Sequence, residues 1–119
     1  GDFLVKDTAI LLVEVVTVED KGGVRFVGVD CGFNTFNLPA IYHYHQEIVL
    51  CRAAAAPPTI SCTVAGHINE AGDIFAENCA LPEVREGDVL ADPLGLAGCG
   101  DLRKLSESCL VQRTWRPKA

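Results

Sequence analysis

The sequence has 119 residues with 49% hydrophobic and 22% charged side chains, which predicts one globular domain and excludes a disordered chain. Its formal net charge of -6 argues against nucleic-acid binding, because neutralising phosphates requires a basic face. The apolar runs are too short to span a bilayer, and no basic start followed by a long apolar block marks a secretory signal.

The first half of the chain predicts a β-hairpin. Residues 3–6 can form a short strand, and residues 8–18 are dense in Ile, Leu and Val, which favours a long and largely buried strand. A turn that contains Gly22 and Gly23 follows, and residues 24–30 are expected to form the return strand.

The rest of the chain also predicts strands, separated by turn residues. We expect a loop at 31–39, a strand at 40–52 with Tyr42 and His43 on opposite faces, and a connection at 53–58. Further strands are expected at 59–65, 74–77, 89–91 and 108–115, with one or two helical turns at 101–108. About eight short strands with little helix predict an all-β Greek-key barrel or sandwich, formed by residues 1–119 as a single β-domain.

Two acidic residues follow the strand at 59–65. Glu70 and Asp73 are separated by Ala71 and Gly72, so a tight turn is expected to present two carboxylates. Such a turn is common on protein surfaces, and the functional interpretation therefore depends on the rest of the chain.

The six cysteines form neither a CxxC pair nor a Cys/His zinc pattern. We expect reduced, mostly structural thiols in a cytoplasmic protein, with three disulfides in a secreted protein as the alternative. His43 and His45 have a spacing compatible with a metal on one strand face, but no third ligand lies nearby in sequence, so no metal site is predicted.

The order of several motifs resembles a known family. Residues 1–5, residues 11–13 with the hairpin up to Asp30, and the motifs that follow occur in a characteristic order. This order resembles that of the C-terminal β-domain of the pyridoxal-phosphate-dependent ornithine, arginine and diaminopimelate decarboxylases, which have the alanine-racemase fold type. The likeness is greatest to the diaminopimelate branch and covers roughly residues 1–100. The later motifs are Gly32-Phe33-Asn34, Leu38-Pro39-Ala40-Ile41-Tyr42, Asn69-Glu70-Ala71-Gly72-Asp73 and Gly87-Asp88-Val89-Leu90.

The resemblance implies that this chain is part of a larger enzyme. In the family, a (β/α)8 barrel binds pyridoxal phosphate through a lysine Schiff base, and the β-domain packs against it. A homodimer then places β-domain residues of one subunit at the active site of the other, where an amino-acid substrate binds. None of the four lysines matches the cofactor lysine. We therefore expect the barrel to belong to a longer chain, and this chain alone to be inactive.

Three residues correspond to the family's Cys-Glu-Ser-x-Asp motif. Glu70 and Asp73 match its glutamate and aspartate, and the resemblance implies that they bind substrate, with Glu70 contacting the distal amine. Asn69 stands at the position of the catalytic cysteine, and an amide cannot donate a proton at neutral pH.

Other motifs match only in part. In the family's Arg-Pro-x-Leu-Tyr motif, Tyr42 corresponds to the substrate-binding tyrosine, whereas Leu38 replaces the arginine that binds a distal carboxylate. Cys99 falls at the position of a tyrosine that approaches the cofactor phosphate. Two hypotheses remain open: a decarboxylase acting on an unusual amino acid, or an inactive β-domain that serves dimerisation or protein interaction.

Overall fold

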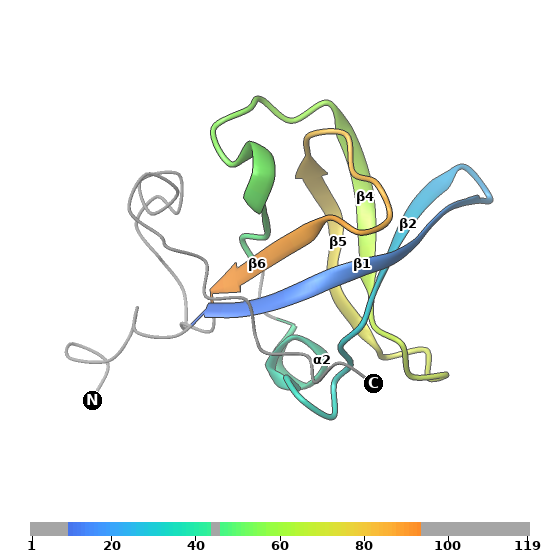
Figure 1. The fold of residues 1–119 in the computed structure, drawn as a ribbon. Helices are drawn as coiled ribbons and strands as arrows, with labels where there is room; N and C mark the ends of the chain where they lie inside the picture. Colours follow the sequence, from blue (N-terminus) through green and yellow to red (C-terminus); the bar gives the residue numbers. More distant parts are fainter. Residues whose placement is uncertain (1–9, 44–45, 94–119) are drawn as a thin grey trace, which may run out of the picture.

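The computed structural model describes residues 10–43 and 46–93 of the chain. Their strands form one six-stranded sheet in the order β3-β6-β1-β2-β4-β5, which curls into a half-barrel (Figure 1). The predicted all-β class is therefore confirmed. The elements are β1 (Ile10–Lys21), β2 (Val24–Val29), α2 (Leu38–Tyr42), β3 (Val49–Leu50), the 3-10 helix η1 (Cys51–Ala53), β4 (Ile60–Ala65), β5 (Ile74–Leu81) and β6 (Val89–Pro93).

Strand β1 is the long central strand of the sheet. Its first half pairs with β6, and its second half pairs with β2, both antiparallel. The register shifts between Val15 and Thr17, at the junction of the two halves. The β1–β2 turn consists of Gly22 and Gly23, whose φ angles of 59° and 81° suit glycine and match a two-residue hairpin. The predicted hairpin is confirmed.

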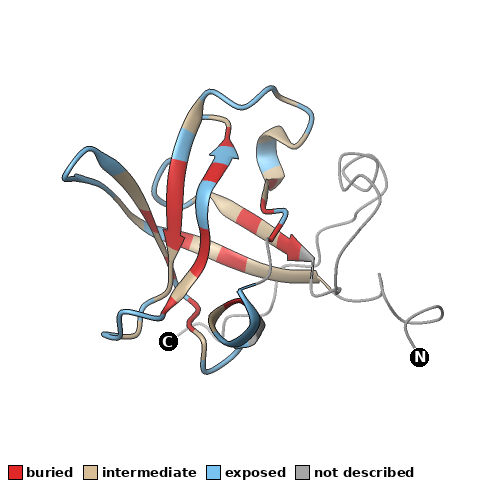
Figure 2. Cartoon of the chain, turned by 180° about the vertical axis from the view of Figure 1, so that it is seen from behind, coloured by how far each residue is buried: buried red, intermediate tan, exposed pale blue. Residues whose placement is uncertain are grey.

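Two further strand pairs extend the sheet from β2 to its edge. β2 pairs parallel with β4, and β4 pairs antiparallel with β5, which leaves β5 at one edge. Alternating inward residues of these strands build the core, and Figure 2 shows buried and exposed stretches along each strand. The most deeply buried side chains include Val15, Val27, Val29, Leu50, Val64, Leu81 and Leu90.

The strand predicted at 40–52 is wrong. The chain forms helix α2, then the two-residue strand β3 and helix η1. Pro39 lies in the first turn of α2, where its missing N–H group removes no helical hydrogen bond. His43 ends the helix with a φ angle of 53°, and its backbone N–H donates to the carbonyl of Pro39 at 2.9 Å.

The strands predicted at 59–65, 74–77 and 89–91 are confirmed as β4, β5 and β6, with β5 extending to Leu81. The strands predicted at 3–6 and 108–115, and the helical turns at 101–108, lie outside the described residues. No helix within the described ranges is long and apolar enough to cross a membrane.

The carboxylate of Asp92 is buried without a hydrogen-bond partner. Asp92 on β6 is 2% exposed, and neither of its oxygens has a hydrogen-bond partner. Burial raises the pKa of Asp92 to about 7, because transfer from water penalises the charged form. Asp92 therefore favours its neutral form in the folded state.

Asp92→Asn should stabilise the protein at pH 8 relative to the wild type. The folded pKa of about 7 lies above the ordinary value of 3.8, so the favourable contribution of the protonated Asp92 is complete below about pH 4. This contribution is lost as the pH rises to about 7, which lowers the free energy of unfolding by at most about 4 kcal/mol. Urea unfolding of both proteins at pH 5 and pH 8 measures the difference.

The matched control is Asp20→Asn. A hydrogen bond from Arg25 lowers the pKa of Asp20, so this exposed residue stays ionised between pH 5 and pH 8. Its substitution should not reproduce the pH-dependent gain. An equal effect of Asp92→Asn at both pH values would contradict the predicted titration of Asp92.

Candidate functional site

The buried carboxylate of Asp73 joins two loops at one end of the sheet. Asp73 is 3% exposed, and its Oδ1 accepts a hydrogen bond from the backbone N–H of Phe33 at 2.8 Å. Its Oδ2 accepts one from the backbone N–H of Ile68 at 2.7 Å. Because both oxygens accept backbone hydrogen bonds, Asp73 holds loop 31–37 against loop 66–73.

Two glycines make room for this carboxylate. A Cβ atom added to Gly66 would collide with both oxygens of Asp73. One added to Gly32 would lie 3.0 Å from Asp73 Oδ2 and 2.8 Å from the side chain of Ile68. The close approach of backbone and carboxylate therefore explains the absence of a side chain at both positions.

Backbone hydrogen bonds complete the acidic turn. The N–H of Asp73 donates to the carbonyl of Glu70 at 3.0 Å, and the N–H of Gly66 donates to the carbonyl of Asp73 at 2.8 Å. The N–H of His67 donates across to the carbonyl of Cys31 at 3.2 Å. Asn69 and Glu70 remain exposed on this hydrogen-bonded turn, so the side chain of Glu70 faces solvent.

Helix α2 follows loop 31–37 and lies at the same end of the sheet as the acidic turn (Figure 1). The ring of Phe36, just before α2, packs on Phe75 of β5 with centroids 6.3 Å apart. On the helix itself, Ile41 is 58% and Tyr42 is 61% exposed. The fold thus brings α2, which carries Tyr42, and the turn that carries Glu70 to one end of the domain, and a substrate site shared by these two residues stays a prediction.

Asp73 has a different environment from the other predicted site residues. It faces the interior of its own two loops, whereas Asn69, Glu70 and Tyr42 are exposed. Direct contact of Asp73 with a substrate stays a prediction; its observed contacts position the loop that carries Glu70.

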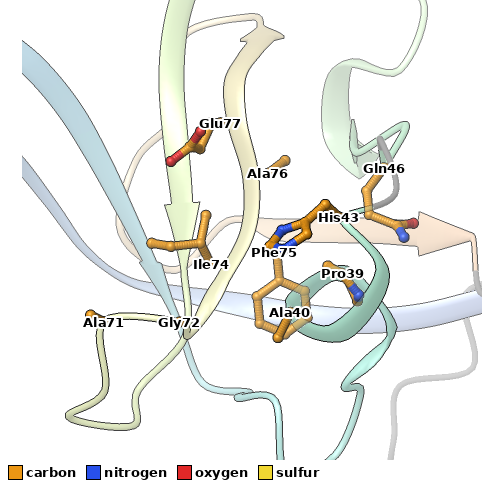
Figure 3. A pocket seen from close by; sticks show the side chains of 10 residues that line it. All are labelled: Pro39, Ala40, His43, Gln46, Ala71, Gly72, Ile74, Phe75, Ala76 and Glu77. Carbon is orange, nitrogen blue, oxygen red and sulfur yellow. The ribbon is translucent and has the colours of Figure 1, made fainter.

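A pocket of about 480 Å³ lies between α2 and the start of β5. Figure 3 shows Ala71 and Gly72 of the acidic turn at one end, with His43 and Gln46 at the other. The pocket thus connects the acidic turn to the segment after α2. It is lined by Pro39, Ala40, His43, Gln46, Ala71, Gly72, Ile74, Phe75, Ala76 and Glu77.

The sequence analysis assigned no binding role to His43, Gln46 or Glu77. These side chains come together because α2 packs against β5. The sequence analysis expected a strand at 40–52, and it therefore did not predict this contact. The useful signal was Pro39, which favours the first turn of a helix.

Two predicted positions have no side-chain description. Leu38 begins α2, and its side chain is not described, while Cys99 lies outside the described residues. His45 also lies outside them, and residues 10–43 and 46–93 contain no cluster of three His, Cys, Asp or Glu residues suited to a metal ion.

Comparisons with known proteins agree with this geometry. The family model for the C-terminal sheet domain of pyridoxal-dependent decarboxylases matches residues 3–93. A diaminopimelate decarboxylase of Methanothermobacter thermautotrophicus is 41% identical over 91 residues, covering 76% of this chain and 21% of that protein. The diaminopimelate decarboxylase of Escherichia coli is 40% identical over 101 residues, covering 76% of this chain and 24% of that protein.

Solved structures give the same result. A crystal structure of a diaminopimelate decarboxylase has a TM-score of 0.71 and 36% identity, covering 80% of this chain and 25% of that chain. Another, from M. jannaschii, has a TM-score of 0.71 and 27% identity, covering 86% of this chain and 21% of that chain. The chain therefore spans about a quarter or less of the length of these relatives.

Asp73→Asn should lower the free energy of unfolding by about 2 kcal/mol, since an amide can accept only one of the two backbone hydrogen bonds. Its NH2 group would also face a second donor. Chemical denaturation measures the loss. Glu70→Gln is the matched control on the same turn, and it should leave stability nearly unchanged because Glu70 is exposed. Equal stability losses for the two variants would refute the anchoring role of Asp73.

Proposed function

We propose a role in amino-acid decarboxylation for this chain, which belongs to the pyridoxal-dependent decarboxylases and forms their C-terminal sheet domain. In this role the domain contributes Glu70 and Tyr42 to the substrate end of an active site. The observation that carries the proposal is the anchoring of the acidic turn by Asp73, which holds Glu70 exposed at the same end as α2.

The family depends on pyridoxal phosphate, but the described residues do not fit this cofactor by themselves. A Schiff base requires a lysine, and Lys21 lies at the end of the β1–β2 hairpin, 71% exposed and 2.6 Å from Glu19. We infer that a (β/α)8 barrel of the same protein holds the cofactor and supplies its carbanion chemistry. Contact of Cys99 with the cofactor phosphate belongs to the same proposal.

Glu70 is suited to bind an ammonium group. An exposed carboxylate on a hydrogen-bonded turn can accept charge-assisted hydrogen bonds from a cationic substrate end, and the backbone of the turn is already ordered before binding. Tyr42 supplies a phenolic hydroxyl from the neighbouring helix. These two residues would orient the substrate, and Asp73 would keep Glu70 in position.

The substrate is proposed to be an amino acid other than diaminopimelate. Leu38 stands where the family has an arginine that binds a distal carboxylate, and leucine offers no hydrogen-bond donor. Asn69 stands where the family has its catalytic cysteine, so proton donation at this position would need another group. A substrate with a distal amine and no distal carboxylate suits this set of side chains.

We further propose a cytoplasmic homodimer in which each β-domain serves the partner's active site. The exposed Ile41 and Tyr42 on α2 support an interface at this end of the domain. The same observation favours the second candidate function, a non-catalytic β-domain that serves dimerisation or protein interaction.

The absorption spectrum of the full-length protein, before and after borohydride treatment, distinguishes the two functions. A Schiff-base band that borohydride removes is expected for the decarboxylase, together with amino-acid-dependent release of carbon dioxide. A full-length protein with no such band would contradict the proposal and leave the interaction domain as the better explanation.

Glu70→Gln in the full-length enzyme should raise the KM for the amino acid by about 10-fold to 100-fold, since a charged hydrogen bond to the substrate amine is lost. Steady-state carbon dioxide release measures this effect. Glu86→Gln is the matched control, because Glu86 is exposed in the loop at the opposite end of β5. Unchanged kinetics for Glu70→Gln would remove the substrate-binding assignment.

A further inference from the structure

Two buried cysteines face each other across strands β4 and β5. Cys62 and Cys79 are direct partners in the antiparallel register, and they are 2% and 4% exposed. Directly opposed residues project from the same face of a sheet, so both thiols point into the core. The thiol of Cys62 lies 3.5 Å from the backbone carbonyl of Cys79, to which it donates a hydrogen bond.

The register of this pair suits a covalent cross-link. Opposed residues of antiparallel strands have Cα atoms about 4.5 or 5.5 Å apart, depending on the type of pair. Disulfides form at Cα separations of about 4.4–6.8 Å. Both types of pair fall within this interval, so joining Cys62 to Cys79 requires side-chain rotation and little movement of the strands.

The two thiols differ in reactivity. The pKa of the Cys62 thiol is lowered chiefly by a hydrogen bond from the thiol of Cys79 and to a smaller extent by the positive charge of Arg25, while burial acts in the opposite direction. That hydrogen bond also raises the pKa of Cys79. Arg25 pairs directly with Cys62 across β2 and β4. Cys62 is therefore the nucleophile, because the thiolate is the reactive form.

The ladder is irregular directly beside the pair. Between the Cys62–Cys79 pair and the Val64–Ala76 pair, β4 contributes one residue and β5 contributes two. The extra residue is accommodated by Asn78, whose φ angle is 52°. Glu77 and Asn78 are exposed, and β5 is an edge strand, so local opening at this bulge gives a small oxidant access to the thiols.

We propose that Cys62 and Cys79 are an oxidation site that forms a cross-strand disulfide with hydrogen peroxide as the oxidant. The Cys62 thiolate attacks one peroxide oxygen, the O–O bond breaks, and the second oxygen leaves as water after taking a proton. The sulfur of Cys79 then displaces the oxygen of the resulting sulfenic acid, which leaves as a second water. Two thiols and one peroxide thus give one disulfide and two waters.

The disulfide would enclose the acidic turn in a covalent loop. The chain between Cys62 and Cys79 contains loop 66–73, with Glu70 and Asp73. Joining its ends restricts the opening of β5 away from β4. Oxidation would therefore rigidify the base of the candidate site without altering any residue that lines the pocket.

The sequence permits a direct test by mass spectrometry. Residues 53–85 contain no internal lysine or arginine, so trypsin releases Cys62 and Cys79 in one peptide with no other cysteine. The full-length protein is treated with hydrogen peroxide, freed of the oxidant, blocked with N-ethylmaleimide in a denaturant that exposes the buried thiols, and digested without reduction. The expected product is peptide 53–85 lighter by two hydrogen atoms, with no label, whereas the untreated protein should carry two labels.

The matched variant is Cys79→Ala, which keeps a small apolar side chain at the core position and removes the second thiol. In wild-type protein, oxidation should slow backbone hydrogen exchange in Ile74–Leu81 by about tenfold, because opening of β5 is restricted. The variant should show neither this change nor the loss of two hydrogens. These readouts do not depend on decarboxylation, so they test this proposal separately.

Two outcomes would overturn the proposal. One is recovery of peptide 53–85 with two labels after peroxide treatment. This result must hold both in buffer and when the peroxide treatment is carried out in urea just below the concentration that unfolds the protein. The other is oxidation that joins Cys62 or Cys79 to a different cysteine.

Discussion

The hydrogen bonds from Phe33 and Ile68 to the carboxylate of Asp73 are the constraint on which the end of the domain around the acidic turn depends. A buried carboxylate is costly unless charge-assisted hydrogen bonds compensate it, and here two backbone donors do so. The donors come from different loops, so one side chain fixes both. Loop 31–37 leads into α2 and loop 66–73 carries Glu70, and their relative position follows from this shared anchor.

Three acidic residues of this domain have three different environments. Glu70 is exposed and available to a ligand, Asp73 is buried and bound by backbone amides, and Asp92 is buried with neither oxygen hydrogen-bonded. Glu70 and Asp73 are close in sequence and appear equivalent there. The distinction arises from folding, because Gly32 and Gly66 leave space for the carboxylate of Asp73 to turn inward.

Local chemistry made parts of the fold predictable. Gly22 and Gly23 specify a tight turn between two apolar runs, and the β1–β2 hairpin follows from that short-range signal. The alternation around Tyr42 was misleading, because Pro39 and the packing of α2 on β5 favour a helix there. The acidic turn could be recognised from residues 66–73, but the inward direction of Asp73 depends on Phe33, forty residues earlier. Contacts of that kind, and the pocket they create, are not encoded in local periodicity.

The parallel pairing of β2 with β4 has a consequence for the order in which this domain folds. The β1–β2 hairpin is local and can form within about 1–10 μs. Pairing of Arg25 with Cys62 must first close a long intervening chain, which makes it slower. We expect loops 31–37 and 66–73 to meet only after β2 has paired with β4. The end of the domain that contains the acidic turn should therefore fold late. Until then, the free edge of β2 can pair with other chains, and nascent protein is most vulnerable to aggregation during this interval.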